Sequence, residues 1–551
     1  MKTSITNRSV RAGIQSRHHL QHHLVPGDGP RDLSRDGTRD VPRDMARNVR
    51  RDLQKPIRVM KFGGTSVGDA ACIAQVVQIV RAASQESHVV VVVSAMSGVT
   101  NKLIEAAVHS EAGEQAPAAV IFEGIRRQHQ SAIEALIPSA EQRSHLDRKM
   151  NDLYQEGDRL CRGAVLLREL TLRSRDAISS LGERLSAPLV TAALAERGIA
   201  SAAIEATELV VTDSCHGAAE PFIDLTRELC DSRLRPLLEQ GIVPVVTGFI
   251  GATPEGVLTT LGRGGSDYSA TILGAALDAD EVVIWTDVDG LQTVDPRLVP
   301  GGCTIPEISY REAAELAYFG AKVLHPKTLR AIAQCGIPLW IRNTFTPELR
   351  GTRITPAGPS ACDRVTALTA IQDVVMITVG GPGMVGVQDV LGRTVRTTAA
   401  LRADVLLISQ SSSQNDLCLV IASTHARATV EALRHEFAHD LAHEKAEHIN
   451  VDAGVAMVAV VGQNVSGRTR FVGRTFRALD SENLNIVAIA QGSTESTISL
   501  VVAKKDVKAA LACLHREFQL GTPSNKIIGE QEDYLMPCVL PEHADLADQK
   551  Q

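Results

Sequence analysis

Aromatic residues and paired cysteines are both scarce in this chain of 551 residues. Aromatics make up 3% of it, so the cores of its domains must be mainly aliphatic. The ten cysteines are scattered and form no C-x-x-C motif. This spacing argues against a disulfide framework or a zinc site, and it is typical of a protein kept in a reducing cytosol.

Long apolar runs and an excess of positive charge are also missing. No apolar run approaches the roughly 18 residues that a membrane-spanning helix needs. The formal net charge is −7, which leaves no basic surface for nucleic acid or an anionic membrane. We therefore expect a soluble cytoplasmic protein that binds neither.

The apolar residues that are present, 44% of the chain, suffice for several cores. At about 100–200 residues per domain, the length predicts three folded units, or a large one with smaller ones. Residues 1–55 differ from the rest. Arginine recurs there at every fourth position from Arg31 to Arg51, interrupted by Gly37 and Pro42, with few large apolar residues. We expect a disordered low-complexity tail, with Met45 as an alternative translation start.

Short apolar runs alternate with helical patterns between residue 56 and about residue 350. This alternation predicts a mainly parallel sheet covered by helices on both faces, with ligands bound beyond the carboxyl ends of the strands. Polar side chains fall at those ends, among them Lys61, Ser94 and Thr286. The runs are Ile57–Met60, Val89–Val93, Val243–Thr247, Val282–Trp285 and Pro338–Ile341.

The turn after the first run reads Lys61-Phe-Gly-Gly-Thr-Ser-Val67. Its two glycines let the main chain approach a ligand, and the N–H groups that open the next helix favour an anion. Lys61 adds a compact positive charge for a phosphate. The pattern is not that of a P-loop. On its own, the spacing is about as typical of plain turn chemistry as of a phosphate site.

A second cluster reads Leu261-Gly-Arg263-Gly-Gly-Ser266-Asp267 and follows a hairpin turn expected at Pro254–Gly256. We expect Ser266 or Asp267 to cap a helix that runs to about Leu277. An arginine over a glycine-lined helix start favours a carboxylate site over a capped helix with a surface arginine. Glu183, in Ser180-Leu-Gly-Glu-Arg-Leu-Ser186, is by itself typical of a solvated helix residue.

Residues 374–518 contain a repeat that aligns without gaps at an offset of 81 residues. Each copy reads strand, helix, strand, strand, helix, which predicts two small ferredoxin-like modules. Gln410 and Gln491 follow the second strand of each copy, ahead of the polar runs Ser411–Ser413 and Gly492–Thr494. These glutamines are candidate contacts for an effector. The other interpretation is that the repeats only hold a dimer together.

Six motifs together, in this order, resemble those of aspartate kinases, and the resemblance covers about residues 56–525. It implies an α/β amino acid kinase fold followed by two ferredoxin-like ACT domains, and the synthesis of 4-phospho-L-aspartate from aspartate and ATP. The motifs are Lys61-Phe-Gly-Gly-Thr-Ser66, Val93-Ser-Ala-Met-Ser-Gly-Val-Thr-Asn101, Ser180-Leu-Gly-Glu183, Leu261-Gly-Arg-Gly-Gly-Ser-Asp-Tyr268, Trp285-Thr-Asp-Val-Asp-Gly290 and Phe319-Gly-Ala-Lys-Val-Leu-His-Pro326.

The resemblance also implies roles for single residues. Lys61, Asp267 and Lys322 would be catalytic, with both lysines on the nucleotide phosphates. Aspartate would be held by Thr100, Glu183, Arg263, Gly264, Gly265 and Ser266, with Glu183 near its amino group and Arg263 on a carboxylate. ATP, which is expected to bring its own Mg²⁺ without protein ligands, would be held by Lys61, Gly63, Gly64, Thr65, Ser66, Thr286, Asp287, Gln292, Arg297, Lys322 and Val323.

One position departs from the family pattern. Gln292 stands where many relatives carry a tyrosine, so a stacking contact to adenine is expected to be missing, with a consequence for nucleotide affinity.

The repeats resemble paired ACT domains, which bind amino acid effectors at their interface. They look closest to the kinase and ACT part of bifunctional aspartate kinase–homoserine dehydrogenases, which favours threonine over lysine as effector. The chain ends soon after the second copy, so no dehydrogenase domain is expected. The expected organisation is a catalytic domain at 56–350, ACT domains at 368–447 and 448–525, and a tail at 526–551, in a homodimer or larger assembly.

Three alternatives remain open. Gly381-Pro-Gly-Met-Val-Gly386 spells G-x-G-x-x-G and suggests a dinucleotide-binding oxidoreductase. Against this, the paired stretch Gly462–Gly467 lacks the middle glycine, the unit is short, and no acid ends its second strand. The chain could also be another amino acid kinase, acting on glutamate or a related acid. The third alternative is a catalytically weak, effector-sensing subunit.

Overall fold

The structure is a computed structural model, and it describes residues 55–319, 324–359, 363–380, 387–410, 416–442, 448–465, 467–491 and 496–521. Residues 1–54 of the expected N-terminal tail, the expected C-terminal tail, Gly381–Gly386 and the runs after Gln410 and Gln491 lie outside these ranges. Among the described residues, no helix is long and apolar enough to cross a membrane.

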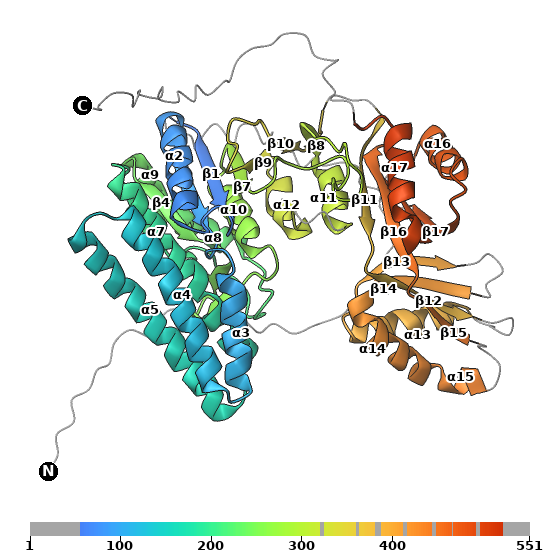
Figure 1. Ribbon diagram of the computed structural model, residues 1–551, viewed down its shortest axis with the longest axis horizontal. Helices are drawn as coiled ribbons and strands as arrows, with labels where there is room; N and C mark the ends of the chain where they lie inside the picture. Colours follow the sequence, from blue (N-terminus) through green and yellow to red (C-terminus); the bar gives the residue numbers. More distant parts are fainter. Residues whose placement is uncertain are drawn as a thin grey trace, which may run out of the picture. The chain divides into compact units, whose positions relative to one another are not determined.

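The larger part of the chain is built on an eight-stranded sheet in the order β3-β4-β2-β1-β7-β9-β10-β8 (Figure 1). Every adjacent pair is parallel except β9 and β10, which are antiparallel. All five predicted apolar runs coincide with strands of this sheet, and the predicted turn at Pro254–Gly256 joins a separate hairpin, β5 and β6. The strands are β1 (Ile57–Phe62), β2 (His88–Val93), β3 (Ser201–Ile204), β4 (Val243–Thr247), β5 (Ile250–Ala252), β6 (Leu258–Thr260), β7 (Glu281–Thr286), β8 (Glu307–Ser309), β9 (Leu339–Asn343) and β10 (Thr352–Thr355).

Helices cover both faces of this sheet, as predicted (Figure 1). Side chains alternate along a strand, so Met60 and Phe62 of β1 enter the core that α2, α3, α4, α5 and α7 share. Lys61 points to the opposite face, where α10 packs. The helices are α2 (Ala70–Glu86), α3 (Val99–Glu111), α4 (Gln115–Leu136), α5 (Ala140–Leu167), α6 (Leu172–Ser179), α7 (Leu181–Glu196), η1 (Ala206–Glu208), α8 (Ile223–Arg233), α9 (Arg235–Glu239), α10 (Gly265–Ala276), α11 (Tyr310–Tyr318) and α12 (Pro326–Ala333).

Two antiparallel four-stranded sheets follow, in the orders β13-β14-β12-β15 and β11-β16-β18-β17. Each repeat supplies three strands and two packed helices, and each sheet takes its fourth strand from outside its own repeat. The strands are β11 (Arg364–Ile371), β12 (Val374–Gly380), β13 (Val405–Gln410), β14 (Asp416–Ala422), β15 (His448–Asp452), β16 (Val455–Gln463), β17 (Ile486–Gln491) and β18 (Thr497–Ala503). The helices are α13 (Val387–Ala400), α14 (Ser423–Glu436), α15 (Ala438–Ala442), α16 (Thr469–Asp480), η2 (Lys504–Asp506) and α17 (Val507–Glu517).

The two small domains are interlocked, because the fourth strand of each sheet comes from outside the repeat that forms the rest of that sheet. β11 precedes the first repeat in sequence but pairs with β16 of the second. β15 ends the first domain by pairing with β12. The domain boundaries expected near residues 368 and 448 therefore lie within or beside strands that link one repeat to the other.

Candidate active site

Lys61 and Asp267 form an ion pair at the carboxyl end of β1. The ammonium nitrogen of Lys61 lies 2.5 Å from Oδ1 of Asp267, which stands in the first turn of α10. Lys61 is only 8% exposed, so this cation is partly removed from water and retains a strong local field. The fold thereby brings together two residues that lie about 200 positions apart in the chain.

Glu183 lies in the first turn of α7 and is 3% exposed. The sequence alone suggested a solvated helix residue, and the structure shows that this is wrong. Burial raises the pKa of Glu183 to about 8, while the main chain of Ala95, the charge of Lys61 and the hydroxyl of Ser266 act in the opposite direction. Its Oε2 has no hydrogen-bond partner within the described part of the chain. A buried, unpaired carboxylate oxygen beside a cation is suited to a ligand that brings its own donors.

The glycines of the first motif permit close packing around Lys61. A Cβ at Gly64 would lie 3.0 Å from the carbonyl oxygen of Ala95, and one at Gly63 would lie 3.5 Å from the Lys61 ammonium. Ser66 is fully buried and shares a hydrogen bond of 2.7 Å with the Thr344 hydroxyl. Thr65, by contrast, is exposed.

The helix that follows this turn is less open to an anion than the sequence suggested. α2 begins at Ala70, and its N-cap residue Asp69 accepts a hydrogen bond of 2.9 Å from the N–H of Cys72. The side chain of Asp69 therefore occupies the position that an anion would take at this helix start.

The N-terminus of α10 is the more open helix start. Its N-cap is Gly264, with φ +70° and no side-chain cap, so the predicted capping role of Ser266 or Asp267 is wrong. Both side chains face the site instead: Asp267 pairs with Lys61, and Ser266 interacts with Glu183. Arg263 is exposed just ahead of the helix, and its guanidinium has no hydrogen bond or ion pair in the ranges that the structure describes. Gly265 lies against Phe249.

His325 is a site neighbour that the sequence reasoning did not single out, although it lies in the last quoted motif. A Cβ on Gly264 would lie 2.7 Å from the Cβ of His325. Burial, with the nearby charges of Lys327 and Arg263, lowers the pKa of His325. A neutral imidazole therefore borders the Arg263 loop, residues 261–264 between β6 and α10, at neutral pH.

The other predicted residues that the structure describes lie at the start of α3, at the end of β7 and in the loop that follows β7. Thr100 stands in the first turn of α3, after the Ala95 loop, residues 94–98 between β2 and α3. Thr286 ends β7, and its hydroxyl donates to Asp287 over 3.2 Å. Gln292 donates to the Thr304 hydroxyl at 3.0 Å. Arg297 is engaged by Asp295, with Nη2 at 2.6 Å from the carboxylate. Lys322 and Val323 lie outside the described residues, so the proposed convergence of Lys322 on this site stays a prediction.

The candidate effector residues stand at equivalent places in the two small domains. Gln410 is the last residue of β13, and Gln491 is the last residue of β17. Both side chains are exposed, and the two strands are in contact with each other.

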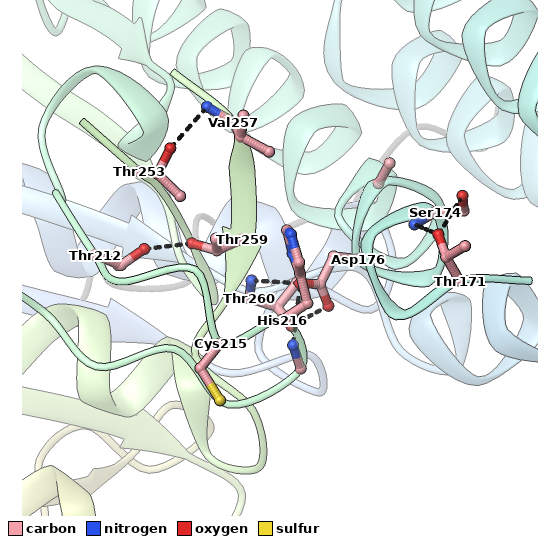
Figure 2. Close-up of polar contacts among 12 residues, drawn as sticks. Thr171, Ser174, Asp176, Thr212, Cys215, His216, Thr253, Val257, Thr259 and Thr260 are labelled. Carbon is pink, nitrogen blue, oxygen red and sulfur yellow. Dashed lines mark hydrogen bonds and ion pairs between the residues drawn. The ribbon is translucent and has the colours of Figure 1, made fainter. Parts of the chain in front are cut away.

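A buried carboxylate next to the site was also missed. Asp176 of α6 accepts hydrogen bonds from His216 and from Thr260, three residues ahead of Arg263 (Figure 2). Nothing in the local sequence marks it, because its partners lie 40 and 84 residues away.

The models of two known protein families match this chain in the same order as its domains. The model of the amino acid kinase family matches residues 56–343, and the ACT domain model matches residues 377–437 and again 458–518. An amino acid kinase domain followed by two ACT domains is thus the class of protein that this fold represents.

Individual relatives narrow the class. The chain is 31% identical over 465 residues to aspartokinase 1, chloroplastic, of Arabidopsis thaliana. The aligned region covers 84% of this chain and 80% of that protein. It is 32% identical over 471 residues to an Arabidopsis thaliana bifunctional aspartokinase/homoserine dehydrogenase, of whose length it spans about half (51%). The chain belongs to the aspartokinase family.

Solved structures agree with this assignment. Aspartokinase III of E. coli, in complex with aspartate and ADP in the R-state, is 30% identical and superposes with a TM-score of 0.71. The match covers 84% of this chain and 100% of that one. The same enzyme in complex with lysine and aspartate in the T-state gives a TM-score of 0.70 at 30% identity.

Proposed function

We propose that this protein is an aspartate kinase, which transfers the terminal phosphoryl group of ATP to the side-chain carboxylate of L-aspartate and gives 4-phospho-L-aspartate. This would be the first step of lysine, threonine and methionine biosynthesis, carried out in the cytoplasm. The observation that carries the proposal is that the Lys61–Asp267 pair lies beside the buried carboxyl group of Glu183, whose Oε2 has no hydrogen-bond partner in the described part of the chain. The E. coli relative that binds aspartate and ADP supports the choice of substrates.

The chemistry requires positioning and charge neutralisation. The side-chain carboxylate of aspartate is ionised at neutral pH, so the attacking group needs no general base. Lys61 would neutralise charge on the moving phosphoryl group, together with Lys322 and the Mg²⁺ that accompanies ATP. Asp267 orients the ammonium of Lys61. Glu183 would accept the substrate's amino group, and Arg263 would hold a carboxylate.

An assay of ADP release, run with and without L-aspartate, tests the proposal. We expect aspartate-dependent release in the wild type and a loss of about 10²–10³ or more in turnover for Lys61→Ala, because one electrostatic donor is removed. Lys55→Ala is the matched control, since Lys55 bonds the carbonyl of Gln85 at the other end of β1. Near-normal turnover in Lys61→Ala would remove Lys61 from the mechanism.

A variant of Arg263 tests substrate binding separately from turnover. Because its guanidinium is exposed and has no partner among the residues that the structure describes, Arg263→Ala should mainly raise the KM for aspartate. An unchanged KM would contradict the assignment.

Two further arms of the assay address the alternatives. Glutamate in place of aspartate distinguishes another amino acid kinase. Absence of ADP release with any acid, in a folded protein, would favour an effector-sensing subunit.

We also propose allosteric feedback by an amino acid bound between the ACT domains of a homodimer or larger assembly, with threonine favoured over lysine. Gln410 and Gln491 support this, because they end two strands that contact each other. Threonine follows from the resemblance of the repeats to those of the bifunctional aspartate kinase–homoserine dehydrogenases, whereas the lysine complex of the E. coli relative favours lysine. Inhibition measured with each amino acid decides between them.

A further inference from the structure

Asp176 is a buried carboxylate that joins three segments distant in sequence. It lies near the end of α6 and is 3% exposed. Its Oδ2 accepts hydrogen bonds from Nδ1 of His216 at 2.9 Å, from the N–H of Gly217 at 3.0 Å and from the N–H of Thr260 at 3.2 Å. Its Oδ1 accepts one from the Thr260 hydroxyl at 2.6 Å (Figure 2).

Every donor in this cluster comes from a loop or strand that borders the candidate site. Thr260 ends β6 and is held from both sides, because its carbonyl accepts the N–H of Ala219 at 2.9 Å. Gly262 follows with φ +80°, and a Cβ there would lie 2.8 Å from the carbonyl oxygen of Gly217. The main chain that carries Arg263 is thus packed directly on the loop that Asp176 holds.

The main chain of Asp176 is tied to the other side of the site. Its carbonyl oxygen accepts the N–H of Ser180 at 3.0 Å and the Ser179 hydroxyl at 3.2 Å, at the junction of α6 and α7. Glu183 stands in the first turn of α7. One residue therefore connects the backbone that presents Glu183 with the backbone that presents Arg263.

We propose that Asp176 is a positioning residue for the acidic substrate, which sets the spacing between the Arg263 loop and the Glu183 helix. Arg263 depends on this support because its own side chain has no partner among the described residues. A displacement of a substrate-holding group by about 1 Å can cost a large factor in rate or affinity. The proposal rests on the proposed function, because Arg263 and Glu183 are assigned there to aspartate.

Asp176→Asn is the first test. Asparagine has an acceptor at only one of the two positions, so it either turns its NH₂ group toward the three N–H donors or reverses the hydrogen bond with the Thr260 hydroxyl, and in both cases the negative charge at the centre of the cluster is lost. We expect the KM for aspartate to rise about tenfold or more, with the KM for ATP unchanged and kcat within about threefold of the wild type. A purely structural role would lower the melting temperature and the amount of active enzyme without this split.

Matched pairs separate the hydrogen bonds from the packing. Thr260→Ser keeps the hydroxyl that Thr260→Val removes. His216→Asn keeps an N–H donor near the Nδ1 position, and His216→Leu removes it. The Ser and Asn variants should behave close to the wild type, while the Val and Leu variants should raise the KM for aspartate. If Asp176→Asn fails to fold, Thr260→Val against Thr260→Ser decides.

A measurement independent of activity distinguishes this inference from the proposed function. Hydrogen–deuterium exchange should become faster in residues 213–221 and 258–266 of Asp176→Asn, and stay unchanged in β1 and β2. If the wild type has no aspartate-dependent activity, the proposed function fails and exchange alone tests the spacing. Unchanged exchange in both segments, or equal KM values for aspartate within each matched pair, would overturn the inference.

Discussion

Glu183 is kept mostly neutral by its burial at neutral pH, and this has a consequence for stability. Its pKa is raised from an ordinary value of 4.5 to about 8. A carboxyl group whose pKa is higher in the folded state favours folding while it is protonated. That contribution is fully present below about pH 4.5 and is lost as the pH rises through about 8.

Glu183→Gln should remove this pH dependence. Glutamine is neutral and of nearly the same size, so the melting temperature of the variant should exceed that of the wild type by an amount that grows between pH 5 and pH 8. The KM for aspartate should rise about tenfold or more, because the substrate's ammonium group would favour the ionised form of Glu183, and glutamine cannot reproduce that charged hydrogen bond, which is worth about 1.5–3 kcal/mol. Thermal unfolding across pH 5–9 and steady-state kinetics measure the two effects.

The exposed Glu86, at the end of α2, supplies the control. Glu86→Gln should follow the wild-type melting curve at every pH. If Glu183→Gln gives a melting profile parallel to that of the wild type, the carboxyl group is not the cause of the pH dependence.

At this scale, the sequence singles out candidate residues more readily than it predicts their environments. Lys61 and Arg263 stand out because glycines flank them within a few positions. The burial of Glu183 could not be read locally, since it follows from α7 packing so close to the Ala95 loop that a Cβ on Gly182 would lie 2.6 Å from the Cβ of Ala95. Asp176 was missed for the same reason.

At the scale of elements, the start of α10 shows why a capping rule failed. Ser266 and Asp267 are good N-cap residues, but one faces Glu183 and the other pairs with Lys61. Gly264 takes the cap position instead, in a left-handed conformation that an L-residue adopts only at a cost.

Gly264→Ala should therefore damage activity more than stability. The left-handed backbone costs alanine about 1–2 kcal/mol, and the new Cβ would lie 2.7 Å from the Cβ of His325. We expect that His325 and the Arg263 loop shift, with a large fall in kcat/KM for aspartate. Kinetics and chemical unfolding of the variant provide the measurement.

Gly256 offers a matched control, because it has φ +81° and no atom within 4 Å of an added Cβ. Gly256→Ala should lose a similar amount of stability and keep its activity. Equal activities in the two variants would show that the contact with His325 does not matter.

The strands of the large sheet were predictable because each is a continuous apolar run. The positions of β11 and β15 in the small domains were not predictable from the sequence, because the residue pattern of each strand is compatible with either sheet. Only the long-range pairs β11–β16 and β12–β15 fix their places.

At the scale of the whole molecule, the second small domain holds the loop that follows β7. The N–H of Leu368 in β11 donates to the carbonyl oxygen of Thr293 at 2.7 Å. Val294 and Val299 are buried in the same apolar core as β16, β18 and α17. Gln292 and Arg297, both predicted nucleotide contacts, lie in this loop. A shift of the second small domain should thus reach the nucleotide side of the site before the aspartate side.

Val294→Ala tests this route. Removing two buried carbons leaves a cavity between the loop and the second small domain and should cost roughly 2 kcal/mol of stability. We expect the effect of the amino acid effector on the KM for ATP to shrink, because the loop no longer follows the domain closely. The KM for aspartate without effector should stay near the wild-type value. Kinetics with ATP varied, at zero and saturating threonine or lysine, measure the coupling.

Val243→Ala is the control, since Val243 is equally apolar and buried but starts β4 in the core of the large domain. It should lose comparable stability and retain the full effector response, which separates loss of coupling from loss of stability. If Val294→Ala also retains the full response, the signal does not travel through the loop after β7. In that case the hydrogen bonds from β11 to the α11 segment offer another route, among them those of Thr366 to Glu312 and of Thr369 to the carbonyl oxygen of Phe319, and α11 leads toward the aspartate side through its contact with α12, which His325 caps.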